Sequence, residues 1–173
     1  MLEAAIFVVF PFCMAFAAIS DMLSMTIANR VSLLLGVTFL VVAPLTGMDW
    51  QLYGMHVLAG VTVLLITFSL FAFGGLGGGD AKLLATTALW MGFGPNLMQY
   101  LVYSAFFGGI LTLMILSYRR SALSVFTGQN PFLRNFANKD EGVPYGIALG
   151  IGGLAVFPDT ALVQWALDRL ASA

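Results

Sequence analysis

The sequence predicts an all-α protein, a polytopic integral membrane helix bundle of about six transmembrane helices with both termini extracytoplasmic. Three observations lead to this prediction. Of the 173 residues, 60% are hydrophobic and 9% are charged, and the mean hydropathy is +0.97, so too few charges remain to cover a soluble globule. Long charge-free intervals recur along the chain, and basic residues gather between alternate intervals. We expect one domain over residues 1–173.

The charge-free intervals locate the expected helices, because a bilayer core requires about 20 apolar residues per transmembrane helix. The interval 83–118 is too long for one helix, and the turn residues at 92–96 divide it in two. The expected spans are residues 4–20, 31–48, 55–74, 80–93, 97–118 and 142–158. Apolar residues at helical spacing over about 160–171 favour a further helix lying on the outer membrane surface.

The basic residues orient these spans, because cytoplasmic loops carry an excess of Lys and Arg. Arg30 follows the first span, Lys82 follows the third, and the polar stretch 119–141 carries four more basic residues between the fifth and sixth spans. The connections at 49–54 and 92–96 carry none. The three basic connections are therefore expected to be cytoplasmic.

Charge and cysteine content exclude several classes of function. The net charge is −1 and no dense basic patch exists, so the sequence predicts no nucleic-acid partner. Cys13 is the one cysteine and lies inside the first apolar interval, which leaves no intrachain disulfide and no cysteine metal cluster. We expect neither a metal nor a cofactor, and the expected surroundings are the lipid bilayer.

A glycine-rich stretch departs most clearly from what a membrane helix bundle requires. Residues 74–79 contain five glycines in six residues and lead directly into Asp80. Irregular backbone at membrane depth is tolerated only where protein buries it or where it lines a water-filled cavity. The stretch therefore predicts a wet pocket. We also expect the fourth helix to open at Asp80, where the helix dipole and free N–H groups stabilise a carboxylate.

Two acids stand out once the topology is assigned. The other six of the eight acidic residues fall in solvated positions, whereas Asp21 closes the first span and Asp80 opens the fourth. A compact bundle can bring this pair together at the cytoplasmic membrane edge. Two facing carboxyl groups share a proton, and one can act as base while the other acts as acid toward water. We assign the ionised role to Asp80 and the protonated role to Asp21 at a helix C-terminus. The residues alone equally allow helix capping or cation binding.

Three blocks of the sequence resemble the type IV prepilin peptidases, which are membrane aspartyl proteases. Residues 77–83, Gly-Gly-Gly-Asp-Ala-Lys-Leu, resemble their Gly-x-Gly-Asp-x-Lys-Leu signature. Residues 21–30 resemble the first catalytic aspartate and the Ile-Pro-Asn-like element that follows it. Residues 143–149 resemble their Pro-Tyr-Gly element. The blocks occur in the order that the family shows.

The resemblance implies a role for each matching residue. Asp21 and Asp80 are the expected catalytic pair. Gly77 and Gly79 are expected to shape the loop that presents the second aspartate, and the remaining residues are expected to support the site or line its pocket. These supporting residues are Asn29, Lys82, Pro144, Tyr145 and Gly146.

The resemblance also implies an activity and a location. It implies an endopeptidase in the bacterial inner membrane that cuts the leader from prepilin or pseudopilin precursors, with its active site toward the cytoplasm. Long relatives carry a large insertion, commonly with paired cysteines, between the first two spans. Here about ten residues separate these spans and Cys13 is alone, which resembles the short branch associated with tight-adherence (Flp-type) pili.

Three alternatives accompany this interpretation. A presenilin-type intramembrane aspartyl protease shares Gly-x-Gly-Asp, but Lys82 and residues 144–146 argue against it, because that group has Pro-Ala-Leu in the late span. A small ion-coupled transporter could use the same two acids to bind a cation or to relay protons. A non-enzymatic assembly subunit would need neither acid.

Overall fold

The computed structural model describes residues 1–121, 134–138 and 142–172, and within these ranges every regular element is a helix. The rest of the polar stretch 119–141, which includes Lys139, lies outside the described residues. The helices are α1 (Leu2–Ser24), α2 (Asn29–Leu45), α3 (Trp50–Ala72), α4 (Gly78–Met91), α5 (Pro95–Arg120), α7 (Arg134–Ala137), α8 (Tyr145–Val156), the 3-10 helix η1 (Phe157–Asp159) and α9 (Ala161–Ala171).

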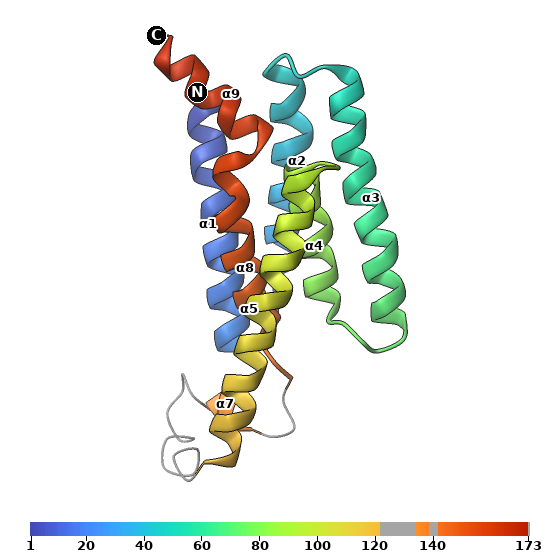
Figure 1. Cartoon of the computed structure of the whole chain (residues 1–173), viewed down its shortest axis with the longest axis vertical. Coiled ribbons are helices and arrows are strands. Elements are labelled where there is room, and N and C mark those ends of the chain that lie inside the picture. The colour runs from blue at the N-terminus through green and yellow to red at the C-terminus, as the bar shows by residue number, and fades with distance from the viewer. Residues whose placement is uncertain (122–133, 139–141, 173) are drawn as a thin grey trace.

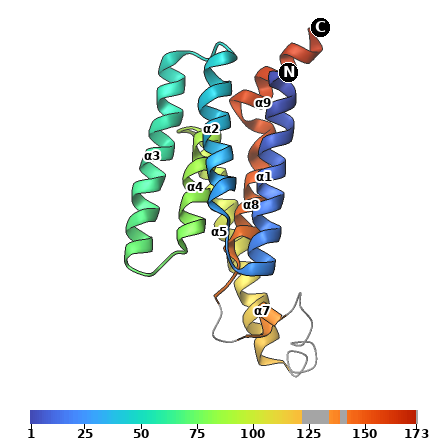
Figure 2. The same ribbon diagram turned by 180° about the vertical axis from the view of Figure 1, so that it is seen from behind.

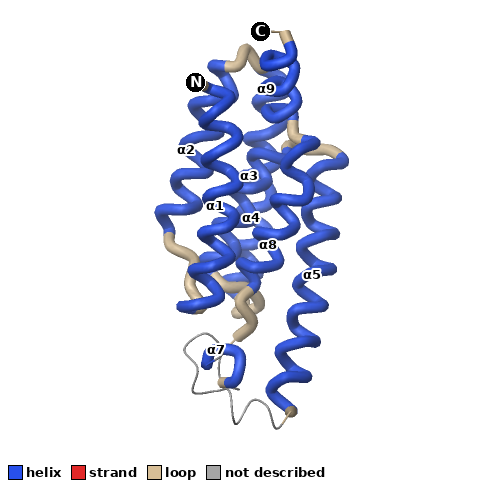
Figure 3. The backbone as a smooth tube through the Cα atoms, turned by 90° about the vertical axis from the view of Figure 1, so that its left-hand side faces the viewer, coloured by secondary structure: helices blue, strands red, loops and turns tan. Residues whose placement is uncertain are grey.

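The long helices run side by side and alternate in direction along the chain (Figure 1). The N-terminus and the C-terminus lie at the same end of the bundle (Figures 1 and 2). The α1–α2 and α3–α4 connections, the end of α5 and the start of α8 lie toward the other end. At that end α5 extends past its neighbours, with α7 beside it (Figure 3).

Helix α4 occupies the centre of one half of the bundle. It packs most extensively against α3 and next against α2, and it also contacts α8 and α5. In the other half, α8 packs against both α5 and α1. Near the C-terminal end of α4, the buried indole of Trp90 donates a hydrogen bond to the Leu35 carbonyl of α2 at 3.1 Å. Helix α4 is thereby held between elements that are distant in sequence.

Within the described residues, three helices are long and apolar enough to cross a membrane: α1, α3 and α5, with 23, 23 and 26 residues. A fourth span results if α8 with η1 and α9, which are bent by 44° relative to each other, are counted as one. The apolar helix α2 has 17 residues and α4 has 14. The chain is thus a helical protein with three to four candidate membrane spans, and the expected number of six stays a prediction.

Helix ends differ from the predicted intervals where local capping decides them. Helix α3 begins at Trp50 rather than at 55, because the Asp49 carboxylate accepts the backbone N–H groups of Gln51 and Leu52 at 2.9 and 3.4 Å. Helix α1 continues beyond residue 20 to Ser24. The Met25 N–H donates the last helical hydrogen bond to the Asp21 carbonyl, and the left-handed conformation of Met25 (φ 52°) then turns the chain out of the helix.

The start of α4 also differs from the prediction. The helix begins at Gly78, so Asp80 is its third residue rather than its first. Gly77 precedes the helix in an extended conformation and acts as its N-cap residue. Asp80 still lies in the first turn, where backbone N–H groups lack helical partners, so the expected electrostatic setting of its carboxylate is retained.

Candidate active site

Asp21 lies in the last turn of α1 and is buried, with 5% of its surface exposed. Its Oδ2 accepts a hydrogen bond of 2.7 Å from the backbone N–H of Gly146, in the first turn of α8. A Cβ at Gly146 would lie 2.8 Å from the Cβ of Asp21 and 2.9 Å from Oδ2. Glycine is therefore required for α8 to come this close to the carboxyl group.

Asp80 is half-buried in the first turn of α4. Its Oδ2 lies over Gly77, at 2.7 Å from the position that a Cβ would take there. Gly79 packs against the α1–α2 connection, since a Cβ on it would lie 3.1 Å from the Cβ of Ile27. Gly77 thus borders the Asp80 carboxyl group, and Gly79 borders the α1–α2 connection. These are the two glycines that the sequence predicted to shape the loop.

Asp21 and Asp80 line one cavity of about 250 Å³. The rest of its wall comes from the two connections that meet at this end of the bundle: Met25, Thr26, Ile27, Gly77, Gly78 and Gly79. A pocket therefore lies at the glycine-rich stretch, where the sequence predicted one, and both singled-out acids face it.

The protonation roles expected for the two acids do not separate by helix dipole alone. Asp80 faces the start of α4, as expected. Asp21 lies in the last turn of its own helix, but it also accepts the N–H of Gly146 at the start of α8. Each carboxyl group thus has a backbone N–H group nearby, so helix dipoles do not assign the ionised role to one acid.

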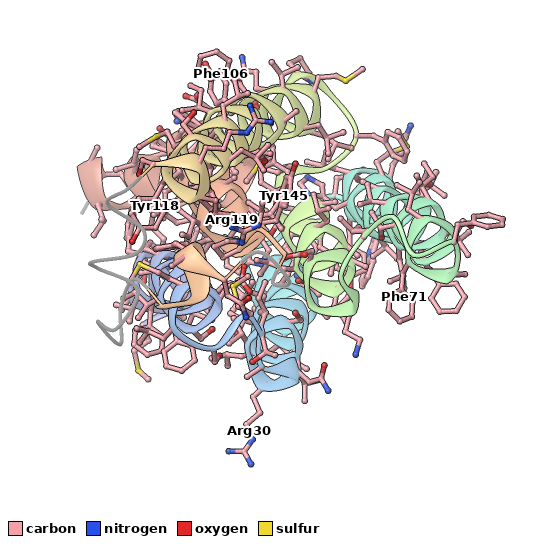
Figure 4. The ribbon with its side chains drawn as sticks, turned by 90° about the horizontal axis from the view of Figure 1, so that it is seen from below. Arg30, Phe71, Phe106, Tyr118, Arg119 and Tyr145 are labelled. Carbon is pink, nitrogen blue, oxygen red and sulfur yellow. The ribbon has the colours of Figure 1, made fainter. Side chains whose placement is uncertain are left out.

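Two of the supporting residues lie at the starts of α2 and α4, and the others lie at the start of α8. Asn29 and Lys82 lie outside the cavity, where the Lys82 Nζ donates a hydrogen bond of 2.8 Å to Asn29 Oδ1 and ties the start of α4 to the start of α2. Pro144 precedes α8 as its N-cap residue. Tyr145 lies toward the middle of the bundle, whereas Arg30 projects away from it (Figure 4).

Three residues of the α1–α2 connection line the cavity without a role predicted from the sequence. Met25, Thr26 and Ile27 follow the apolar helix directly, and the signal was the polar Ser24 and Thr26 just past an acid at the membrane edge. Ile27 contacts both Gly79 and Gly146, so it joins the parts of the site that carry the two acids. Among the residues that the structure describes, no group of three or more His, Cys, Asp or Glu side chains could hold a metal ion.

These features define a class of protein: a helical membrane protein with two carboxyl groups in one cavity at the end of the bundle that carries its basic connections. Residues 8–113 match the model of the type IV leader peptidase family. This match covers more than half of the 173 residues, and the chain belongs to that family. The matched segment contains Asp21 and Asp80 and ends within α5. Neither the comparison with curated proteins nor that with solved structures found a match.

Proposed function

We propose that this protein is an aspartyl endopeptidase that removes the leader from type IV prepilin-like precursors at the cytoplasmic membrane face. The observation that carries the proposal is the single cavity that Asp21 and Asp80 share. Membership of the leader peptidase family supplies the reaction, hydrolysis of a peptide bond in a protein precursor. It also favours a protease over the ion-coupled transporter that the same two acids would allow.

The chemistry follows from two acids around one water. One carboxylate accepts a proton from the water while the other, protonated, donates a hydrogen bond to the scissile carbonyl oxygen. The water oxygen then bonds to the carbonyl carbon. When the resulting tetrahedral species collapses, the C–N bond breaks and the proton taken from water passes to the leaving nitrogen. The pair returns to its starting state with one shared proton.

The topology that suits this function has six spans, with the cavity toward the cytoplasm and both termini outside the bacterial inner membrane. Arg30, Lys82, Arg119 and Arg120 lie at the end of the bundle that holds the cavity, and the chain termini lie at the opposite end. An excess of Lys and Arg favours a cytoplasmic location. A precursor could then keep its leader in the cytoplasm and its apolar helix in the membrane.

The short branch of the family is the better fit for this chain. Only residues 25–28 connect α1 to α2, which leaves no room for the large cytoplasmic insertion of the long relatives. We therefore propose a precursor of a tight-adherence (Flp-type) pilin as the substrate.

The proposal is tested by co-expressing such a precursor with the wild-type protein, Asp21→Asn or Asp80→Asn. Cleavage is read by gel shift and by N-terminal sequencing of the product. Asparagine keeps the size of the side chain but cannot act as acid or base, so we expect each variant to lose activity by about 10²-fold or more. The matched control is Asp159→Asn, which makes the same change at an exposed position in η1, and it should cleave like wild type.

Full activity in Asp21→Asn or in Asp80→Asn, with both proteins folded in the membrane, would refute the aspartyl pair. Absence of cleavage by the wild-type protein for every pilin precursor tested would refute the substrate assignment.

A further inference from the structure

A second pocket opens on the other side of Asp80. It has a volume of about 180 Å³ and lies between α4, α5 and α8. Its walls are mostly apolar: Leu76, Asp80, Leu84, Leu101, Ser104, Ala105, Tyr145 and Leu149. Asp80 therefore stands between this apolar pocket and the cavity that it shares with Asp21.

The apolar pocket runs from the catalytic level into the membrane part of the bundle. Leu84 lies one helical turn beyond Asp80 in α4, and Leu149 lies one turn beyond Tyr145 in α8. A turn corresponds to about 5–6 Å along the bundle, which is the reach of one side chain. The pocket thus begins where the peptide bond would be cut and ends among leucines.

The edges of the pocket suggest how a side chain would enter it. Ala105 on α5 is exposed although it lines the pocket, and α4 contacts α5 far less than it contacts α3. On the opposite side the ring of Tyr145 packs over Gly108, where a Cβ would lie 2.6 Å from Cε1. The pocket therefore opens toward the lipid between α4 and α5. The ring of Tyr145 closes it on the side where α8 packs against α5.

We propose that this apolar pocket is a specificity subsite that accepts the apolar side chain next to the scissile bond on the membrane-embedded side of the precursor. The inference rests on the proposed function. In the proposed reaction the leader stays in the cytoplasm and the apolar helix of the precursor stays in the membrane, so the residue that begins this helix is the one that matches leucine walls reaching inward. Ala105, at the open edge, determines how large a side chain can enter.

A competing groove exists on the outer face of α2, α3 and α4. Its volume is about 490 Å³, and its lining includes Leu33, Val37 and Leu64. Neither Asp21 nor Asp80 lines it, whereas Asp80 lines the apolar pocket. A side chain adjacent to the reacting bond must lie beside the carboxyl groups, which favours the pocket.

The test uses precursors that differ only in the residue after the scissile bond, with Leu, Phe, Ala or Asp at that position. The wild-type full-length protein should cleave the Leu and Phe precursors with a higher kcat/KM than the Ala and Asp precursors. Ala105→Phe fills the edge of the pocket. It should lower the kcat/KM ratio of the Leu precursor to the Ala precursor by about tenfold or more. Val102→Phe, which enlarges an exposed side chain of α5 outside the pocket, is the matched control and should keep the wild-type ratio.

The outcomes separate the subsite from the proposed function. If the wild type cleaves no precursor, the proposed function fails. If the wild type cleaves all four precursors equally, or if Ala105→Phe keeps the wild-type ratio, the subsite fails while the peptidase stands. Cleavage of the Ala precursor by Ala105→Phe shows that this variant is folded.

A second measurement covers the case in which Ala105→Phe does not fold. A photoreactive aromatic residue is placed after the scissile bond of the precursor and irradiated in complex with Asp80→Asn. We expect adducts in the segments 101–105 or 145–149. Adducts in 33–40 would locate this side chain in the outer groove and overturn the proposal.

Discussion

Glycines decide how closely the chain can surround each of the two acids. Gly146 lets a backbone N–H reach Asp21, and Gly77 leaves the space over which the Asp80 carboxyl group lies. Neither Gly77 nor Gly146 has a positive φ, so glycine is required at these positions for space and not for backbone conformation. An added methyl group at either site would meet the carboxyl oxygen itself.

We expect Gly77→Ala to reduce precursor cleavage by about 10²-fold without unfolding the protein. The new Cβ would lie 2.7 Å from Asp80 Oδ2 and would force the carboxyl group to move, and misplacement of a reacting group by about 1 Å costs this much. Gly75→Ala is the control, because its Cβ would make an ordinary contact at 3.5 Å with the Leu70 carbonyl. Cleavage is measured with the purified variants, and equal rates for the two would contradict this role of Gly77.

Helix α4 carries Asp80, and its packing against α3 is unusually close. A Cβ at Gly60 of α3 would lie 2.5 Å from Leu89 Cδ2 and 3.2 Å from the carbonyl oxygen of Ala85. Near the same contact, His56 of α3 hydrogen-bonds through Nδ1 to the Leu89 carbonyl at 2.6 Å, and Gly92 leaves room for its ring. This contact holds the C-terminal half of α4 against α3.

Gly60→Val is expected to lower the stability of the folded protein by about 1–3 kcal/mol, because extra atoms in a packed interface force α3 and α4 apart. The control is Gly54→Val, which places the same side chain in the same helix with nothing within 4 Å of its Cβ. Thermal unfolding in detergent compares the two. A Tm for Gly60→Val equal to that of Gly54→Val would show that α4 does not need this close contact.

In the described part of the chain, most basic residues gather at one end of the molecule. In the topology predicted from the sequence, Arg169 is the one of the seven Lys and Arg residues that lies on the side of the termini. Its Nε forms an ion pair of 3.2 Å with Glu3. At the other end Arg119 donates hydrogen bonds of 2.9 Å to the carbonyls of Phe136 and Gly142, which joins α5 to the chain before α8. The cavity of Asp21 and Asp80 lies at this basic end.

We expect a cysteine at residue 172 to react with a membrane-impermeant thiol reagent added outside the cell, and a cysteine at residue 142 to react only after the membrane is opened. The substitutions are Ser172→Cys and Gly142→Cys, both at exposed positions, because basic connections stay in the cytoplasm. Both substitutions are made in a Cys13→Ala protein, in which the buried native cysteine is removed, so that only the introduced cysteine can react. Labelling in the reverse order would show that the active site faces outward.

Much of the candidate site, namely its two acids and its glycine-rich stretch, could be singled out from the sequence because its signals are local. An acid at the edge of an apolar interval is costly wherever the helices pack, so Asp21 and Asp80 stood out without a structure. The glycine-rich stretch predicted a pocket in the same way. The start of α4 at Gly78 could not be predicted, since a helix end depends on which backbone groups find caps.

The sequence by itself determined that this protein is helical and membrane-embedded, and it singled out the two acids of the candidate site, because hydropathy and charge are properties of short segments. Only the tertiary structure decided which backbone groups and side chains surround those acids. The N–H that Asp21 accepts comes from Gly146, 125 residues away, and the apolar pocket beside Asp80 is shared by α4, α5 and α8. Such contacts depend on how separate helices pack, and side-chain volumes at close approaches such as Gly60 and Gly146 decide that packing.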